Sequence, residues 1–190
     1  MSKTKKILLT VTLIGAIGGL AGFATFSAFS STTTNPGNTF DTGSVILGDN
    51  DANAAMYNVT NRGPGSSTVR CITVTYTGTM PADVSLYTPS TIDAGGQYID
   101  LTIEAGTGSP VFSGCTGFVS DATIYTGTLS AFGTAHNTYA NGVPTYPGVQ
   151  TEWDQTDSVT YRYTLTVQDD NNAQNQIISA HDFTWEARNQ

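Results

Sequence analysis

Basic side chains are scarce in this sequence of 190 residues, and lysine is confined to its start. Seven residues are Lys or Arg against fifteen Asp or Glu, which gives a formal net charge of −8. The only lysines are Lys3, Lys5 and Lys6. Such an acidic chain repels phosphate backbones and anionic lipid, so binding to nucleic acid is not expected. The lack of lysine beyond residue 6 also excludes Schiff-base and P-loop chemistry there.

Histidine and cysteine, which supply many catalytic bases, nucleophiles and zinc ligands, occur only twice each. We expect His136 to be a solvated loop residue and His181 to lie at the edge of the core, and no H-E-x-x-H or G-x-S-x-G motif occurs. The run Asp49–Asn53 imitates half of a calcium loop, but Ala54 and Thr60 stand where that loop needs Gly and Glu. We expect a polar turn there, with calcium as the alternative. The sequence predicts no enzyme, no cofactor, and no catalytic or metal-binding residue.

The N-terminus has the layout of a signal peptide. Basic residues at positions 3–6 precede an uncharged, largely apolar run from Ile7 to Phe29, and small residues follow near its end. The run is also long enough for a membrane anchor, which is the alternative. Cleavage after Ala21 would follow a small-x-small pattern, Gly19-Leu20-Ala21. The other candidate is cleavage after Ala28, where Phe26-Ser27-Ala28 places a bulky side chain at the outer position. Removal of residues 1–28 would leave 162 residues and move the formal net charge from −8 to −11.

The two cysteines predict one disulfide. Cys71 and Cys115 lie 44 positions apart, and an even count in an exported chain indicates pairing. Closing such a loop stabilises the fold by up to about 4 kcal/mol in the chain-entropy model. Two free buried thiols are the alternative.

Period-two alternation of apolar and polar residues dominates the rest of the chain and predicts an all-β fold. The alternating runs are rich in Thr and are separated by clusters of Gly, Pro, Asn and Asp, while no stretch of twelve residues has a helical period. About eight half-buried strands indicate a two-sheet, jelly-roll-like sandwich. The predicted strands are Phe40–Leu47, Ala54–Thr60, Thr68–Thr77, Asp83–Thr88, Tyr98–Glu104, Ala122–Leu129, Val159–Gln168 and Gln176–Ala187.

Two connections stand out. Gly133–Thr151 is too long for a hairpin turn and predicts a surface excursion. Tyr139, Tyr146 and Trp153 could stack on sugar rings or cap the end of the sandwich. Asp169–Asn172 predicts a hairpin turn between the last two strands.

Motifs at both ends of the chain resemble one protein family. Ala24–Phe29 joins the apolar run to a polar stretch, and Asn38–Gly43 (NTFDTG) leads into the first predicted strand. Phe26 is bulky for the outer position of an ordinary signal-peptidase site. These features, with Phe183–Ala187 (FTWEA) in the last strand, resemble the TasA/camelysin family of biofilm-matrix proteins.

The resemblance implies a processing site and a structural role. In this family a SipW-type signal peptidase often cuts between Ala and Phe, which implies cleavage between Ala28 and Phe29. TasA-like proteins are jelly-roll domains that polymerise head-to-tail, the N-terminal segment of one subunit completing a sheet of the next. The implied partners are further copies of the chain, the SipW-type peptidase and an accessory anchor protein. The donor strand would consist of Phe29, Ser30, Ser31, Thr32, Thr33 and Thr34.

The expected organisation is a signal peptide over 1–28, a donor segment over 29–37 and a β-sandwich domain over 38–190. The expected function is that of a secreted structural subunit of extracellular biofilm-matrix or cell-surface fibres. One alternative is a camelysin-type surface metallopeptidase, although the chain carries no recognisable zinc motif. Another is a monomeric glycan-binding surface module that uses the long loop. For the donor segment, the alternative is a disordered stalk rich in Ser and Thr.

Overall fold

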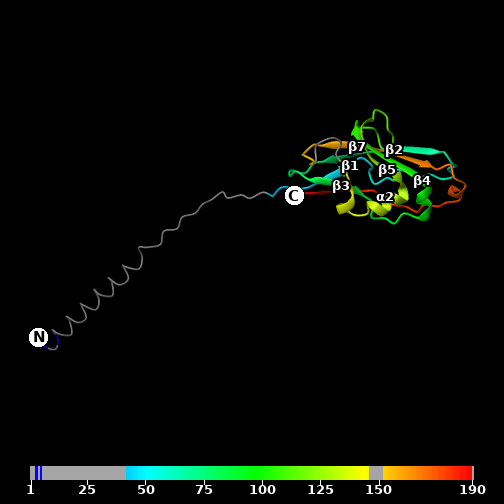
Figure 1. Cartoon of the computed structure of the whole chain (residues 1–190). Helices are drawn as coiled ribbons and strands as arrows, with labels where there is room; N and C mark the ends of the chain where they lie inside the picture. Colours follow the sequence, from blue (N-terminus) through cyan, green and yellow to red (C-terminus); the bar gives the residue numbers. More distant parts are fainter. Residues whose placement is uncertain (1–2, 4, 6–41, 146–151, 190) are drawn as a thin grey trace. The chain divides into compact units, whose positions relative to one another are not determined.

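The computed structural model describes residues 3, 5, 42–145 and 152–189 (Figure 1). Its contacts divide the chain into two units, Met1–Asp41 and Thr42–Gln190, of which the second carries the strands. The predicted signal peptide, the Ala28–Phe29 cleavage site and the donor segment all lie outside the described residues. No helix in the described ranges is both long and apolar enough to cross a bilayer.

The larger of two antiparallel sheets has five strands. Apolar residues recur at every second position along much of its long central strands, because one face lies against the core and the other faces outward. Hydrogen bonds connect the strands in the order β1-β2-β7-β4-β5. The strands are β1 (Leu47–Asp49), β2 (Ser67–Tyr76), β4 (Ile99–Thr107), β5 (Val119–Thr128) and β7 (Ser158–Val167).

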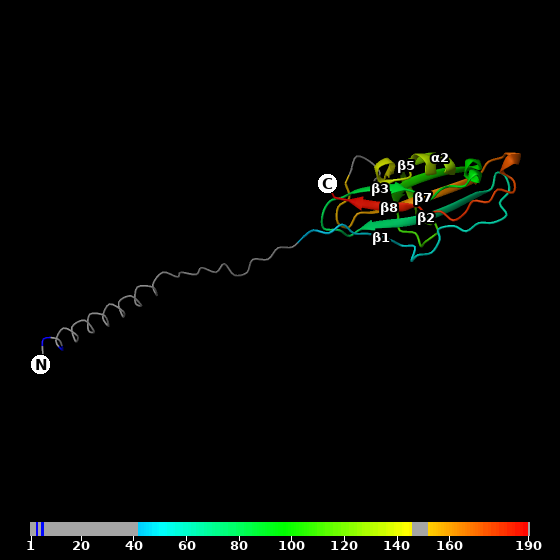
Figure 2. The same ribbon diagram turned by 90° about the horizontal axis from the view of Figure 1, so that it is seen from below.

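The smaller sheet has three strands and covers the inner face of the larger one (Figure 2). Its order is β6-β3-β8, with β3 (Asp83–Tyr87) between β6 (Val143–Pro144) and β8 (Thr184–Arg188). The core between the sheets contains fully buried side chains from both. Leu86 comes from the small sheet and Tyr161 from the large one. The described part of the chain is therefore an all-β sandwich, as the sequence predicts.

Short helices lie in the connections between strands. The α-helix α2 (Leu129–Ala135) begins at Thr128, whose hydroxyl accepts a hydrogen bond from the backbone N–H of Ala131 at 3.1 Å. Phe132 of this helix is buried and packs edge-to-face on Tyr125, with ring centroids 4.8 Å apart. Three 3-10 turns complete the elements: η1 (Ala94–Tyr98), η2 (Tyr139–Asn141) and η3 (Asn171–Ala173).

Four sequence predictions about strands are wrong. Of the predicted strand Gln176–Ala187, only Thr184–Ala187 lies in a strand. Ala54–Thr60 forms no strand. Of the predicted strand Phe40–Leu47, only Leu47 is in a strand, Phe40 and Asp41 lying outside the described residues. The last two strands, β7 and β8, lie in different sheets and form no hairpin. Asp169–Asn172 does turn, since the Asp170 carboxylate accepts the Asn172 backbone N–H at 2.8 Å, but residues 174–183 then cross to the other sheet.

The predicted disulfide is confirmed. Cys71 on β2 bonds to Cys115, with Cα atoms 5.2 Å apart. Cys115 begins a turn in which the Phe118 N–H donates to its carbonyl at 3.2 Å. The bond thereby holds the connection between β4 and β5 against the outer face of the large sheet.

On that face, Arg162 donates two hydrogen bonds of 2.7 Å to the carboxylate of Glu104.

Candidate functional site

The two histidines lie in separate, half-buried places. The Nε2 atom of His181 and the hydroxyl of Tyr57 form a hydrogen bond of 2.5 Å. His181 is half-buried, so it lies at the edge of the core, as predicted. His136 is not a solvated loop residue: it ends α2, and its ring centroid lies 5.1 Å from that of Phe132. Its Nδ1 bonds to the Asn141 carbonyl at 2.6 Å. In the ranges that the structure describes, no group of three or more His, Cys, Asp or Glu side chains could hold a metal ion.

The aromatic residues around the long loop have structural positions. Trp153 is 1% exposed, and its backbone pairs with that of Ala82. The ring of Tyr139 is covered by the guanidinium of Arg188, whose Cζ lies 4.0 Å from the ring centroid. Tyr146 lies outside the described residues. Trp153 is therefore a capping residue of the sandwich, and its ring has no exposed face for a sugar.

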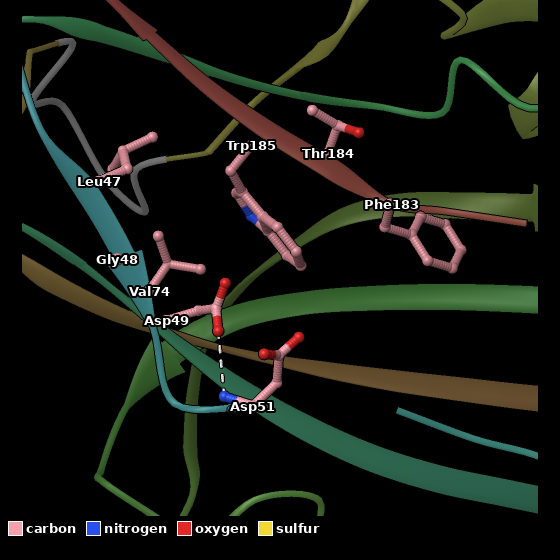
Figure 3. A pocket seen from close by; sticks show the side chains of 8 residues that line it. All are labelled: Leu47, Gly48, Asp49, Asp51, Val74, Phe183, Thr184 and Trp185. Atoms are coloured by element: carbon pink, nitrogen blue, oxygen red, sulfur yellow. Dashed lines mark hydrogen bonds between the residues drawn. The ribbon is translucent and has the colours of Figure 1, made fainter. Parts of the chain in front are cut away.

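An open groove lies between the two sheets on the side where β1 and β8 meet (Figure 3). Both strands are edges: β1 pairs only with β2, and β8 pairs only with β3, among the strands of the described residues. The pocket between them has a volume of about 270 Å³. It is lined by Leu47, Gly48, Asp49, Asp51, Val74, Phe183, Thr184 and Trp185.

Strand register explains which side chains enter this groove. Residues opposite each other on antiparallel strands share a face of the sheet. Leu47 pairs with Tyr76 and Asp49 with Val74, both buried partners, so the side chains of Leu47 and Asp49 face the core side. A carboxylate thus lies on the core-facing side of the edge strand β1, where it remains exposed at the rim of the groove.

On the opposite wall, the register of β8 directs two aromatic side chains inward. Trp185 pairs with the fully buried Leu86, and Phe183 precedes it by two residues. Phe183 stacks at a tilt on Tyr163, with centroids 4.7 Å apart, and Trp185 lies 5.5 Å from Tyr161 in the same way. Yet every residue from 183 to 187 is only half-buried. The inner face of β8 therefore packs on the core and still has apolar surface open to the groove.

Two carboxylates stand at the β1 side of the groove, and Figure 3 shows both beside the space below Phe183 and Trp185. The Asp49 carboxylate accepts the backbone N–H of Asp51 at 3.0 Å, and that of Asp51 accepts the N–H of Asn53 at 2.6 Å. Partial burial raises the pKa of the Asp49 carboxyl, and the hydrogen bond from the Asp51 backbone N–H offsets part of that rise. The hydrogen bond and negative charge of the Asp51 side chain raise the pKa further. The predicted polar turn over Asp49–Asn53 is thus present, and it supplies the acidic rim of the groove.

The groove combines three features that suit an extended peptide. Edge strands offer backbone N–H and C=O groups for pairing, and Phe183, Trp185, Leu47 and Val74 offer an apolar floor and wall. Sequence reasoning placed Phe183 and Trp185 on one face but did not reveal the groove. The signal that could have indicated it is an aromatic pair in a final strand, together with an acid at an inward position of the first strand.

Comparison of the chain with models of known protein families, and with curated proteins, gives no match. Its function therefore has to be inferred from its own residues, from the motifs at its two ends and from the geometry of the groove.

Proposed function

We propose that the chain is a secreted structural subunit that polymerises head-to-tail by donor-strand exchange into extracellular matrix or cell-surface fibres. The observation that carries the proposal is the open groove between the edge strands β1 and β8, which is lined by half-buried aromatic side chains. The resemblance of both chain ends to the TasA/camelysin family supports the same role.

The donor is the segment Phe29–Thr34 of a neighbouring copy, added alongside β8. Six extended residues span about 20 Å, which suffices to pair along the five residues of β8. Main-chain hydrogen bonds supply affinity, and a pocket for a side chain fixes the register. The ring of Phe29 occupies the apolar part of the groove, where its burial contributes about 1.5–3 kcal/mol.

Two further features support assembly into an open fibre. Pro36 and Gly37 separate the donor from the domain, so the donor can reach another subunit. A donor at one end and an acceptor groove elsewhere form a heterologous contact, which generates filaments when it does not close into a ring. A donor beside β8 also gives the small sheet a fourth strand, which brings the sandwich closer to the paired four-stranded sheets of a jelly roll.

Export is part of the proposal. The Cys71–Cys115 disulfide suits an oxidising, extracellular environment. A SipW-type signal peptidase removes residues 1–28, and an accessory anchor protein could attach the fibre to the cell. No observation in the described ranges favours the metallopeptidase alternative. The burial of Trp153 does not favour sugar binding by the long loop.

The first test concerns the secreted protein itself. N-terminal sequencing should read Phe-Ser-Ser-Thr, because cleavage falls between Ala28 and Phe29. Electron microscopy of the same material should show fibres. Salt should speed their growth, since it screens the repulsion between chains of net charge near −11. A mature start at Gly22, an uncut chain, or a monomer under all these conditions would contradict the proposal.

A further inference from the structure

The groove has an acidic end as well as an apolar one. Of the side chains that line it, only Asp49 and Asp51 carry charge, and both are negative. Their carboxylates lie in the same pocket as the aromatic side chains of Phe183 and Trp185. An occupant that matches the whole groove therefore carries an apolar group and a cation close together.

We propose that Asp49 and Asp51 bind the free α-ammonium group of Phe29 from the neighbouring copy, while its ring contacts Phe183 and Trp185. This inference rests on the proposed function, because it names the group that anchors the donor strand. The ammonium and the ring belong to one residue, so a single pocket can hold both. The acidic rim then recognises the processed N-terminus.

The composition of the chain leaves few other cations for this site. After removal of residues 1–28 no lysine is left, so the α-amino group of Phe29 is the only primary amine. Of the four arginines, Arg162 is bound to Glu104 and Arg188 to Glu186, at 2.7 Å in both cases. The α-amino group is protonated below its usual pKa of about 8.

Signal-peptide cleavage creates this cation. Hydrolysis of the Ala28–Phe29 peptide bond consumes one water molecule and leaves a carboxylate on Ala28 and an ammonium group on Phe29. Before cleavage, the Phe29 nitrogen is a neutral amide with one hydrogen to donate. The two carboxylates therefore distinguish a processed subunit from an unprocessed one. A subunit binds tightly to the end of the fibre only after it has been exported and its signal peptide has been removed.

The state of Asp49 fits this role. Its side chain lies on the core-facing side of β1 opposite Val74 and is exposed at the rim of the groove, so a cation can reach it. Partial desolvation raises the pKa of its carboxyl. A cation bound there would replace hydration that the carboxylate has lost and lower that pKa again. The incoming donor strand would cover the exposed rim, and close ion pairs that an interface shields from water can contribute strongly to affinity.

Inward-pointing charges have another use in β proteins, because they protect edge strands from unwanted pairing. The two interpretations predict effects of opposite sign. If the carboxylates only protect the edge, their neutralisation will promote association. If they bind the ammonium group, neutralisation will weaken association even though it lowers the repulsive net charge.

The test compares the mature wild-type chain with D49N/D51N and with the control D121N/D169N. Asparagine keeps a side-chain oxygen that can accept the N–H groups of the turn, so the fold is preserved. Asp121 and Asp169 are exposed and outside the groove, so the control removes the same charge. Sedimentation should give a critical concentration for fibre growth about tenfold higher for D49N/D51N than for the control.

Acetylation of the mature chain gives a second, independent readout, because an amine-directed reagent has one primary amine to modify. Acetylation should raise the critical concentration of the wild type about tenfold and add little to the effect of D49N/D51N. Equal critical concentrations for D49N/D51N and the control would overturn this inference, as would fully additive effects of acetylation and the D49N/D51N substitutions. Neither result would contradict donor-strand exchange itself. Fibres that persist without residues 29–36 would instead overturn the proposed function.

Discussion

Deletion of residues 29–36 from the mature chain should abolish fibre formation and leave a folded monomer. The first strand of the sandwich, β1, begins at Leu47, and the core is built from residues beyond it, so the domain keeps its packing. Size-exclusion chromatography should show a monomer at every salt concentration, and electron microscopy should show no fibres. The melting temperature of the truncated protein should match that of unassembled full-length mature protein.

Two controls separate strand donation from a mere need for a spacer. Replacement of Phe29–Thr34 by six Gly and Ser residues keeps the length of the segment and should also abolish fibres, because the aromatic ring and the strand-prone side chains are lost. A peptide of residues 29–37 should occupy the groove of the mature wild type and shorten its fibres, whereas a scrambled peptide should not. Unchanged fibres from the truncated protein would rule out this donor segment.

Loss of the disulfide should have the largest effect on stability. The Cys71–Cys115 bond closes a separation of 44 residues, and the chain-entropy model assigns about 4 kcal/mol to such a loop. For a domain of this size that corresponds to a fall in melting temperature of about 10 °C. Differential scanning calorimetry with and without reductant measures it.

The matched control for this experiment is the double variant C71A/C115A. It should melt at the lower temperature and should not respond to reductant, because it has no bond to break. Cys71 is fully buried, so part of its effect is the loss of a packed side chain rather than of the bond. Reductant applied to the wild type isolates the bond. Two alkylatable thiols in the native exported protein would contradict the account.

Sequence periodicity located the strands that are long and paired on both sides. Val159–Gln168 corresponds to β7, which pairs with β2 and β4 and whose alternating Val159, Tyr161, Tyr163 and Leu165 are all buried. Ala54–Thr60 lacks such neighbours. Its Tyr57 packs against the core and bonds to His181, so the apolar residues there serve a connecting loop. Alternation alone cannot reveal whether a partner strand exists.

The sequence also did not predict which strands that lie far apart in the chain pair with each other. The turn at Asp169–Asn172 indicated a hairpin, but its local hydrogen bonds do not determine which sheet the chain joins after residue 174. Helix α2 has only seven residues, fewer than two full turns, so it shows little periodicity. The groove depends on β1 and β8, which are far apart in sequence, and so required the structure.

The most direct test of donor-strand exchange in this groove is hydrogen exchange of the β8 amides, compared between monomer and fibre. β8 is an edge strand, so the backbone N–H groups on its outer side should exchange rapidly in the monomer. The account predicts that assembly slows exchange in residues 184–188 at least about tenfold, while β5, at the far edge of the large sheet, changes little. Fibres in which β8 exchanges as fast as in the monomer would contradict it.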